Sequence, residues 1–435
     1  MTDCIAAIST ANGTGGVAII RISGAAALET AKKMFTPSAG VAEFTPNYMY
    51  AGTICGDGFT DYGFMVYFKA PKTFTGEDVV EFQCHGGVRI ARGILKRALE
   101  CGARLAERGE FTRRAFLNGK LSLASAEGMA DMINAESLAL VRAGSMLYRE
   151  RLTREVKEIQ NALKDILAAI AVEIDYPEED AEGIDERKIL FDISALNERL
   201  LRLIQTYSGG KRIKSGVSVA ICGVPNTGKS SLLNALLGYD RAIVSDTAGT
   251  TSDAVEGDIE LNGIKFRLID TAGIRERAGA IEGMGIERAK SAIASADIII
   301  SVTDDGKYID LPKEASGEVI KVFNKCDKLC PHGDYTLAVS ASTGEGLDLL
   351  RYTLAEKGGC EQALDKAYIV EERHYNALTR AAAAIQSAAD GIGVCTLDLI
   401  SVDLKDVWDI LGEITGETAS EEIISTVFEK FCVGK

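Results

Sequence analysis

Residues 223–230 read Gly-Val-Pro-Asn-Thr-Gly-Lys-Ser, and this stretch decides the fold of the chain. It matches the GxxxxGK[ST] pattern of a phosphate-binding loop. An apolar run over 217–221 precedes it and a helix-like run over 231–237 follows it, so we expect a strand, the loop and then a helix. Glycines let backbone N–H groups approach a phosphate at a helix N-terminus. Lys229 is then predicted to reach the β- and γ-phosphates, and Ser230 to bind Mg²⁺.

Two motifs further along the chain fit the γ-phosphate and the metal. Gly249-Thr250-Thr251 lies in a stretch that could close over the γ-phosphate, and Thr251 would supply a second hydroxyl to Mg²⁺. Asp270-Thr271-Ala272-Gly273 follows the apolar run 266–269. Its carboxylate can hold the metal through water, and the Gly273 N–H can reach the γ-phosphate.

The last two motifs fit guanine. Asn324-Lys325-Cys326-Asp327 follows a strand-like run over 319–323, and its Asp327 carboxylate can accept hydrogens from guanine N1–H and the exocyclic amine, which adenine does not offer. Ser340-Ala341-Ser342 follows 337–339 and can donate a backbone N–H to guanine O6. Each motif alone is weak, since an Asp after a strand is more often a turn cap. Five in series predict a GTP-binding domain.

The residues for hydrolysis are less obvious. Many small GTPases place Gln directly after the DxxG motif, whereas this chain has Ile274, which does not polarise water. Arg275 and Arg277 lie nearby, but we expect them to be solvated loop residues. Asn226, inside the phosphate loop, could help to hold a monovalent cation that neutralises charge in the transition state, or it could be an ordinary turn residue.

Composition limits the cellular setting. The 435 residues are enough for two or three domains, and no run of about 18 apolar residues predicts a membrane span. The start at Met1 lacks the basic and apolar segments of a secretory signal. The ten cysteines form no CxxC pair, which favours a reduced, cytoplasmic compartment. Cys326, Cys330 and His332 have a metal-like spacing, but Cys326 belongs to the guanine motif.

The net charge of −15 does not itself predict a nucleic-acid partner. A contact of that kind would need a local basic patch. Two clusters could provide one, and solvated helix faces explain both equally well: Arg89, Arg92, Lys96 and Arg97, and Arg142, Arg149, Arg151 and Arg154.

Hydrophobic patterning divides the chain into three parts. Residues 1–118 mix β-like runs with one helix over 88–101, as in an α+β domain; the runs cover 17–22, 62–68 and 78–83. Residues 119–212 are mostly helical, with apolar residues at helical spacing from 140 to 174. Helical periodicity returns after 365, broken around 391–393. The GTP-binding segment, 216–365, is therefore predicted to be inserted into a helical domain formed by 119–212 and 366–435.

Several blocks along the chain resemble one family, the tRNA modification GTPases called MnmE or TrmE. Beside the five GTP motifs, these blocks are Arg21-Ile22-Ser23-Gly24, Phe74-Thr75-Gly76-Glu77-Asp78, His85-Gly86-Gly87, residues 109–118 and the ending Phe431-Cys432-Val433-Gly434-Lys435. There are two departures: Ser252 stands where the family usually has Arg, and the glycine-rich stretch 12–16 lacks the usual preceding Arg. The resemblance implies a multidomain fold with a folate-binding α+β domain, a helical domain and an inserted Ras-like α/β P-loop domain.

The resemblance also implies cofactors and their sites. A 5-formyl- or 5,10-methylene-tetrahydrofolate would contact Arg21, Glu81, Lys120 and Lys435, residue types that suit a pterin and a glutamyl tail. For Arg21 and Glu81 alone, a salt bridge at the sheet edge would be the simpler interpretation. The implied K⁺ site uses Asn226, Ser245, Thr247 and Thr250, and the implied water-positioning residue is Glu282. The implied contacts to Mg²⁺ and GTP cover Asn226, Thr227, Gly228, Lys229, Ser230, Ser231, Ser245, Asp246, Thr247, Ala248, Gly249, Thr250, Thr251, Asp270, Thr271, Ala272, Gly273, Asn324, Lys325, Asp327, Ser340, Ala341 and Ser342.

Partners follow from the same resemblance. The family forms homodimers whose GTP domains meet across the nucleotide. With the FAD-dependent flavoprotein MnmG (GidA), in a heterotetramer, it adds an aminomethyl or carboxymethylaminomethyl group to C5 of the wobble uridine of certain tRNAs. Cys432 matches a near-terminal family cysteine. It could be a nucleophile on a flexible, glycine-containing tail, or an unpaired surface thiol.

Two other classes of function compete with this prediction. A ribosome-assembly GTPase would use GTP to control docking on rRNA. One such family has two tandem GTP domains, whereas this chain has one; another has a GXXG-type RNA clamp after its GTP domain, and Gly391-Ile392-Gly393 does not match it. A scaffold that binds GTP without turnover is the other alternative.

Overall fold

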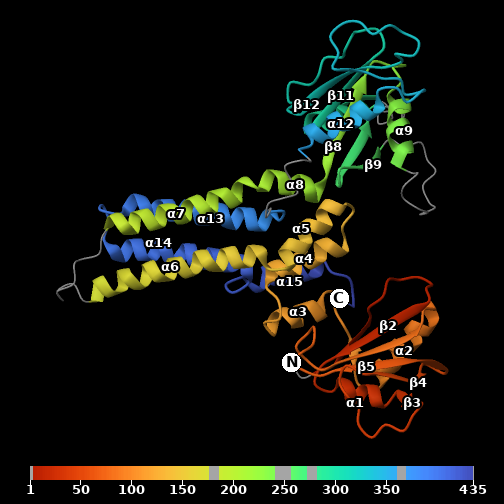
Figure 1. The fold of residues 1–435 in the computed structure, drawn as a ribbon, viewed down its shortest axis with the longest axis vertical. Helices are drawn as coiled ribbons and strands as arrows, with labels where there is room; N and C mark the ends of the chain where they lie inside the picture. The colour runs from red at the N-terminus through yellow and green to blue at the C-terminus, as the bar shows by residue number, and fades with distance from the viewer. Residues whose placement is uncertain (1–2, 176–185, 241–255, 272–281, 360–368, 435) are drawn as a thin grey trace. The chain divides into compact units, whose positions relative to one another are not determined.

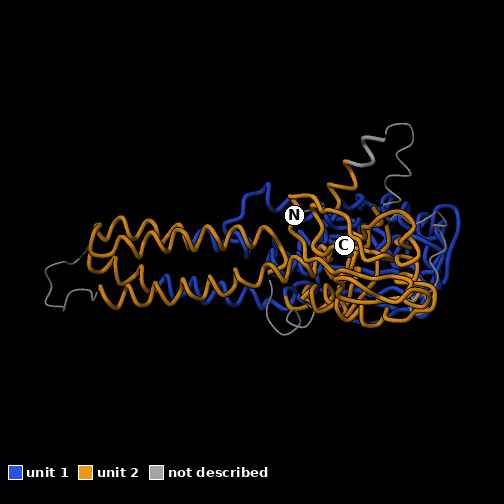
Figure 2. Tube along the Cα trace, turned by 90° about the horizontal axis from the view of Figure 1, so that it is seen from above, with its two compact units in different colours: residues 1–130, 147–164, 408–435 blue, residues 131–146, 165–407 orange. Residues whose placement is uncertain are grey.

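The structure, a computed structural model, describes residues 3–175, 186–240, 256–271, 282–359 and 369–434. They form two compact units (Figure 2): residues 1–130, 147–164 and 408–435, and residues 131–146 and 165–407. The predicted α+β, helical and P-loop architectures are all present (Figure 1). The three predicted domain boundaries stay a prediction.

A seven-stranded sheet forms most of the N-terminal region. Its strands are β1 (Ile5–Ile8), β2 (Val17–Ser23), β3 (Phe35–Pro37), β4 (Met49–Cys55), β5 (Thr60–Phe68), β6 (Val79–His85) and β7 (Arg104–Leu105). Their order is β3-β4-β5-β6-β2-β1-β7, antiparallel except for the β1–β7 pair. The three predicted β-like runs are confirmed as β2, β5 and β6, and the predicted helix as α2 (Val88–Glu100).

The two faces of this sheet have different coverings. Helices α1 (Ala27–Lys32) and α2 cover one face, where alternate residues of β2 such as Ile20 and Ile22 are fully buried. On the other face, helix α3 (Glu110–Leu117) packs Phe111 against the β1 residues Ile5 and Ala7. Arg21 and Glu81 belong to this second face.

Helices complete the first unit. The start of α4 (Leu123–Ile133) packs against α15 (Glu421–Glu429) through an apolar cluster that includes Leu123, Phe428 and Phe431. The first part of α6 (Arg151–Asp175) is joined to the end of α14 (Leu397–Thr415) by a hydrogen bond from Gln160 Nε2 to the Trp408 carbonyl, 3.0 Å long.

Within the second unit, α7 (Glu186–Gln205) lies along α13 (Glu372–Gly391) (Figure 1). The buried residues of α7 recur every three or four positions: Ile189, Ile193, Leu196 and Leu200. The predicted break at 391–393 is confirmed, because α13 ends at Gly391. The helical character predicted over 140–174 is confirmed, but it is divided between two helices, α5 (Leu138–Tyr148) and α6; Glu150 between them has a left-handed φ of 60°.

A six-stranded sheet forms the predicted P-loop domain. Its strands are β8 (Val217–Gly223), β9 (Glu256–Leu261), β10 (Ile264–Asp270), β11 (Ile298–Thr303), β12 (Glu318–Phe323) and β13 (Leu337–Ala338), in the order β13-β12-β11-β8-β10-β9. Only the β9–β10 pair of this described sheet is antiparallel. The described helices of this domain are α9 (Lys229–Asp240), α11 (Glu282–Ser295) and α12 (Leu347–Lys357). Because the carboxyl ends of parallel strands share one edge, the motifs that follow them meet there.

None of the helices that the structure describes combines the length and the apolar character needed to cross a membrane.

Candidate functional site

The phosphate loop runs from the end of β8 to the start of α9. A Cβ on Gly223, which has φ 152°, would lie 2.2 Å from the Val302 carbonyl oxygen. A Cβ on Gly228, with φ 88°, would lie 2.5 Å from Asn324 Nδ2. Both positions therefore require glycine. Asn226 is exposed and left-handed, with φ 69°, a conformation that asparagine tolerates better than most residues.

Side chains inside the loop face its backbone. The Lys229 ammonium donates to the Val224 carbonyl at 2.8 Å, and the Thr227 hydroxyl donates to the same oxygen at 2.9 Å. Thr227 is fully buried and Lys229 nearly so. The predicted phosphate-binding lysine is thus held in the middle of the loop. Ser231, the predicted contact beyond the loop, is exposed on the first turn of α9.

The predicted metal ligands Ser230 and Asp270 are adjacent. The Ser230 hydroxyl donates to Asp270 Oδ2 at 2.6 Å, and Asp270 is almost fully buried at the end of β10. Thr271 fixes this strand end by donating to the Ile221 carbonyl of β8 at 3.0 Å. A hydroxyl and a carboxylate are the oxygen donors that Mg²⁺ prefers, so the residues present fit the ion.

The guanine motifs are tied to the phosphate loop. Asn324, buried at the end of β12, donates from Nδ2 to the Thr227 carbonyl at 2.8 Å and accepts from the Ala341 N–H at 3.2 Å. Lys325 has φ 64°, and its ammonium donates to the Asn226 carbonyl at 2.7 Å and to Asp304 at 2.6 Å.

The carboxylate predicted to recognise guanine, that of Asp327, is hydrogen-bonded by serines of the next motif. The Ser340 hydroxyl donates to Asp327 Oδ1 at 2.6 Å and lies 3.0 Å from the Ser342 hydroxyl. The hydrogen bond from Ser340 lowers the pKa of Asp327, so the carboxylate stays ionised and able to accept hydrogen bonds from the N–H groups of guanine. Ordinary sequence patterns did not indicate Asp304; its position directly after the buried strand β11 is the signal that could have found it.

Several predicted residues lie outside the described part of the chain. These are Ser245, Asp246, Thr247, Ala248, Gly249, Thr250, Thr251, Ala272, Gly273 and Lys435. Ser252 and Ile274 lie outside it as well. Glu282 is the first residue of α11. The K⁺ site and the water-positioning role therefore stay predictions.

The predicted folate residues Arg21 and Glu81 meet on the second face of the N-terminal sheet. They are directly opposite in the β2–β6 register, with Arg21 Nε 2.8 Å from Glu81 Oε1. The Arg21 guanidinium also lies over the Phe111 ring, 5.7 Å from its centroid. Lys120 is exposed in the turn after α3, and its Cε would be 3.2 Å from a Cβ on Gly76.

A buried charge network beside this face was not expected from the sequence. Arg114 of α3 is 1% exposed and forms ion pairs with Asp3, Glu77 and Glu110 at 3.0–3.1 Å. Burial raises the pKa of Glu110, but hydrogen bonds from Arg104, from the Glu107 N–H and from Arg114 outweigh it and leave the pKa lowered. The i,i+4 spacing of Glu110 and Arg114 is the only local signal of this network.

The C-terminal tail is anchored, contrary to the flexible tail expected. Phe431 is buried, Val433 forms a β-bridge with Arg108, and the Ser9 hydroxyl donates to the Gly434 carbonyl at 3.1 Å. Cys432, between these anchors, is exposed. Since Ser9 N–H bonds to Ile19 on β2, the tail is fixed two residues along that strand from Arg21.

The cysteine and histidine residues near the guanine motif form no described metal-binding group. Both ring nitrogens of His332 face carbonyl oxygens, those of Cys330 at 3.0 Å and Asp305 at 3.1 Å. These two hydrogen bonds raise the pKa of His332.

Comparison with known proteins finds matches along nearly the whole chain. The family model described as "MnmE helical domain" matches residues 123–432, and that described as "GTP-binding protein TrmE N-terminus" matches residues 4–120. A tRNA modification GTPase MnmE from Acetivibrio thermocellus is 38% identical over 100% of this chain and 99% of its own length. The protein of the same name from Aromatoleum aromaticum is 38% identical over 100% and 98%.

Among solved structures, the FeoB G-domain from Methanococcus jannaschii covers 33% of this chain and 97% of its own, with 20% identity and a TM-score of 0.25. The full-length relatives and the two family models decide the assignment, and the loop geometry described above agrees with it. The chain belongs to the MnmE family of tRNA modification GTPases.

Proposed function

We propose that this GTPase acts with an FAD-dependent flavoprotein of the MnmG (GidA) type to add an aminomethyl or carboxymethylaminomethyl group to C5 of the wobble uridine of certain tRNAs. The observation that supports the proposal is the Arg21–Glu81 pair, together with the Cys432 tail held at Ser9, whose N–H bonds to Ile19 on the same strand as Arg21. A site of that kind, in a chain that also hydrolyses GTP, suits a one-carbon donor whose use is coupled to the nucleotide cycle.

At the nucleotide site, Lys229 binds the β- and γ-phosphates. Ser230 and Thr251 bind Mg²⁺, and Asp270 holds the ion through water. Asp327 and the Ala341 N–H recognise guanine, while Asn324 and Lys325 brace the phosphate loop. K⁺ is held by Asn226, Ser245, Thr247 and Thr250, and Glu282 orients the attacking water. The contacts of Asn324 with Thr227 and of Lys325 with Asn226 support this arrangement.

The one-carbon donor is a 5-formyl- or 5,10-methylene-tetrahydrofolate. The Glu81 carboxylate suits the N–H donors of a pterin, and the cations Arg21, Lys120 and Lys435 suit the carboxylates of a glutamyl tail. The position of Arg21 between Glu81 and the Phe111 ring supports a flat heterocycle at this face.

Two copies of the chain form a homodimer, and two flavoprotein subunits complete a heterotetramer that acts on tRNA in the cytoplasm. Large apolar side chains on the second sheet face support self-association: Met49, Tyr62 and Phe64 are 48%, 60% and 41% exposed. The GTP-binding domains of the two copies meet across the nucleotide in the presence of K⁺.

The decisive experiment is mass spectrometry of wobble nucleosides in tRNA from cells that lack this chain. We expect the C5-aminomethyl-type uridines to disappear, to return with the wild-type chain and to stay absent with Cys432→Ser. The Cys395→Ser variant is the matched control, because Cys395 is another exposed cysteine and lies outside the tail. Unchanged uridines in the deletion strain would overturn the proposal and favour a role in ribosome assembly.

A further inference from the structure

His332 joins the loop that follows the guanine motif to the turn that follows β11. Its Nδ1 lies 3.0 Å from the Cys330 carbonyl oxygen, and its Nε2 lies 3.1 Å from the Asp305 carbonyl oxygen. The first contact stays within its own loop. The second crosses to the turn after Thr303, the last residue of β11. One imidazole ring therefore bridges two segments at the carboxyl edge of the six-stranded sheet.

The two segments also touch directly beside the ring. A Cβ on Gly306, which has φ 78°, would lie 3.3 Å from His332 Cδ2 and 3.2 Å from the His332 carbonyl oxygen. A Cβ on Gly333, with φ 83°, would lie 3.5 Å from Gly306 Cα. The rings of His332 and Phe323, the last residue of β12, meet edge to face with centroids 5.4 Å apart. Because glycine lets the backbones approach this closely, the ring has a defined position between them.

The two contacts of the ring require both of its nitrogens to donate. A carbonyl oxygen only accepts, and a neutral imidazole has a single N–H, so in the neutral form one nitrogen lone pair points at a carbonyl oxygen. The imidazolium form donates at both nitrogens. The hydrogen bonds to Cys330 and Asp305, together with the negative charge of the Asp305 carboxylate, raise the pKa of His332. Protonation therefore decides whether the bridge contains one hydrogen bond or two.

The charged and titratable groups of the packed segments favour this arrangement. Asp305 accepts from the Lys307 N–H at 3.0 Å and from the Thr303 hydroxyl at 3.1 Å, and these bonds lower its pKa, so it is ionised beside the ring. Burial raises the pKa of Cys326 and of Tyr308, so both stay uncharged near neutral pH. Further charged side chains of these segments have partners of their own: Asp304 with Lys325, Lys321 with Asp334, and Asp327 with Ser340.

The turn that His332 holds carries the partner of the lysine in the guanine motif. Asp304, which precedes Asp305, accepts from Lys325 Nζ at 2.6 Å. The same ammonium donates to the Asn226 carbonyl of the phosphate loop at 2.7 Å. Lys325 and Asn226 both have a left-handed φ, 64° and 69°, a conformation that surrounding contacts must maintain. Asp304 therefore fixes the direction of a flexible side chain that supports the phosphate loop.

We propose that His332 is a positioning residue of the nucleotide site. In its doubly protonated form the ring holds the turn that carries Asp304, and Asp304 keeps Lys325 against the phosphate loop. When the ring loses a proton, one hydrogen bond of the bridge is lost, Lys325 is held less firmly and a guanine nucleotide dissociates faster. His332 acts through Asp304 and Lys325 and not by contact with the nucleotide. The inference rests on GTP binding and not on the proposed tRNA chemistry.

The pH dependence of GDP dissociation tests this role. The rate is followed with a fluorescent GDP analogue on the full-length chain with Mg²⁺, between pH 6.5 and pH 8.5. We expect the wild-type rate to rise about 2- to 10-fold over this range, which corresponds to the loss of one net hydrogen bond. His332→Gln should release GDP at the high-pH wild-type rate throughout, because an amide has no charged form.

The comparison between variants removes other sources of pH dependence. Titration of the phosphates of the nucleotide affects all variants alike, so the difference between the profiles is decisive. His85→Gln is the matched control at another exposed histidine, which pairs with Asp61 in the N-terminal sheet, and it should keep the wild-type profile. A wild-type profile in His332→Gln would overturn the proposal.

Asp304→Ala tests the route from the ring to the phosphate loop. This variant should release GDP faster than the wild type at every pH, because Lys325 loses its carboxylate partner. Adding His332→Gln to it should change nothing further, since the link between the two residues is already broken. If His332→Gln had the same effect in the Asp304→Ala background as in the wild type, the two residues would act independently and the route would be refuted.

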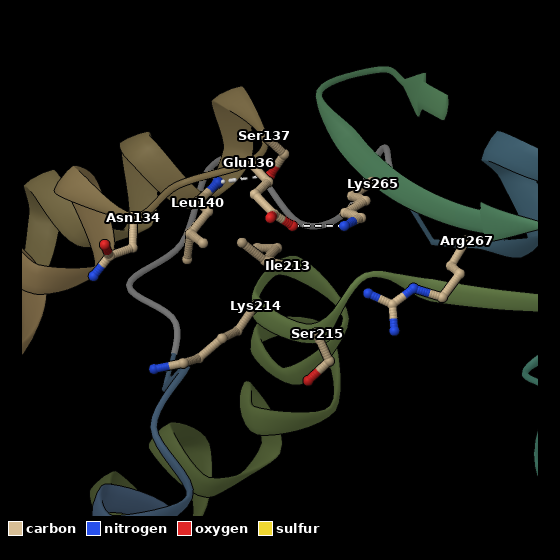
Figure 3. Close-up of a pocket in the computed structure, with 9 residues that line it drawn as sticks. All are labelled: Asn134, Glu136, Ser137, Leu140, Ile213, Lys214, Ser215, Lys265 and Arg267. Carbon is tan, nitrogen blue, oxygen red and sulfur yellow. Dashed lines mark hydrogen bonds and ion pairs between the residues drawn. The ribbon is translucent and has the colours of Figure 1, made fainter. Parts of the chain in front are cut away.

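Asp131 also titrates near neutral pH, but it lies at the other end of the sheet. Burial and the nearby Glu371 carboxylate raise its pKa to about 7. Lys214 lies 2.9 Å from Asp131 and also pairs with Glu371, so the three residues form a triad. Lys214 belongs to α8 (Tyr207–Ser215) and lines a cavity of about 260 Å³ (Figure 3).

The Asp131–Lys214–Glu371 triad therefore provides a second control. Lys214 precedes β8, whereas the nucleotide motifs follow the carboxyl ends of the strands. Asp131→Asn should therefore keep the wild-type profile of GDP dissociation. Loss of the pH dependence in this variant would assign it to the triad and would overturn the role of His332.

Nuclear magnetic resonance gives a second measurement, on the ring itself. Because protonation and nucleotide binding are linked, GDP should raise the pKa of His332 if the protonated ring favours the bound state. The chain has three histidines, so ¹³C-labelled histidine gives few signals, and His332→Gln identifies the one that matters. The same pKa for His332 with and without GDP would refute the proposal.

Discussion

Asn324 Nδ2 donates to the Thr227 carbonyl at 2.8 Å, which joins the guanine motif directly to the phosphate loop. The same side chain accepts from the Ala341 N–H at 3.2 Å, so one buried amide organises three loops. The motifs predicted to bind guanine and phosphate are therefore structurally coupled.

Asn324→Ala should weaken both guanine nucleotide binding and folding, because it leaves the Ala341 N–H without its acceptor and the Thr227 carbonyl without its donor. The loss of stability should be about 1–3 kcal/mol, as for other buried groups left unsatisfied. Calorimetric titration with GDP and chemical unfolding check the two effects. Asn324→Asp keeps the acceptor for Ala341 but buries a carboxylate against the Thr227 carbonyl, so this variant should lose at least as much; a smaller loss would contradict the account.

Gly223→Ala should abolish nucleotide binding, since its Cβ would lie 2.2 Å from the Val302 carbonyl oxygen. The matched control is Gly238→Ala in α9, where no atom lies within 4 Å of the added Cβ. That control should bind normally and gain about 0.5–1 kcal/mol, because glycine weakens a helix interior. Fluorescent nucleotide titration and thermal unfolding separate the two outcomes, and normal binding by Gly223→Ala would refute the steric argument.

The Asp131–Lys214–Glu371 triad should make stability depend on pH. Burial, with the nearby Glu371 carboxylate, raises the pKa of Asp131 to about 7. Because the folded state then binds a proton that the unfolded state has lost, this contribution to stability is present below pH ~4 and is lost as the pH rises toward ~7.

In Asp131→Asn, the urea concentration at the unfolding midpoint should therefore change less between pH 5 and pH 8 than it does in the wild type. Lys214 stays charged over this range, because its two carboxylate partners outweigh its burial and raise its pKa. Asp334→Asn is the control at an exposed carboxylate and should leave the pH profile as in the wild type. A wild-type slope retained in Asp131→Asn would exclude this carboxyl as its source.

The proposed cation site predicts faster GTP turnover in KCl than in NaCl, by a phosphate-release assay. Glu282→Ala should be nearly inactive while still binding nucleotide, because orienting the water acts on the transition state and not on ground-state affinity. Equal turnover in the two salts would remove K⁺ from the mechanism. Retained turnover in the variant would remove Glu282.

Gly434→Ala should displace the tail, since its Cβ would lie 2.2 Å from the Ile8 carbonyl oxygen and φ is 100°. Alkylation of Cys432 by a neutral reagent, read by peptide mass spectrometry, should then change rate with little effect on overall stability. Gly40→Ala, with no atom within 4 Å, is the control; it lies in the loop after β3, at the opposite edge of the sheet from the tail. An unchanged alkylation rate would show that the anchor does not set the position of the thiol.

The GTP-binding domain was predictable because its motifs are local. Gly223 to Ser230 and Asp270 to Gly273 each follow an apolar strand, and strand order places those ends together. The pairing of β1 with β7 was not predictable, since two residues of Arg104–Leu105 carry no periodicity. The helix break at Glu150 was missed for a similar reason. A left-handed φ at a non-glycine residue does not change the spacing of apolar residues in the sequence.

The charge pairs in and beside the candidate sites were also not predictable from the sequence. Arg114 and its three carboxylate partners come from three separate segments, and Lys214 pairs with residues 83 and 157 positions away. Arg21 and Glu81 were found only through the family resemblance, because a cross-strand ion pair has no local signature. Charge pairs of this kind depend on which segments the fold brings together.

Lys214 and Glu371 bring together the two chain connections of the segment that is predicted to form the GTP-binding domain. Residue 210 of α8 packs directly against Ile369, and Tyr207 stacks on Tyr375 with ring centroids 4.2 Å apart. Entry and exit therefore lie side by side, as at other sites where one domain interrupts another. A short glycine–serine linker would join these two chain connections directly. The helices would then remain without the GTP-binding sheet.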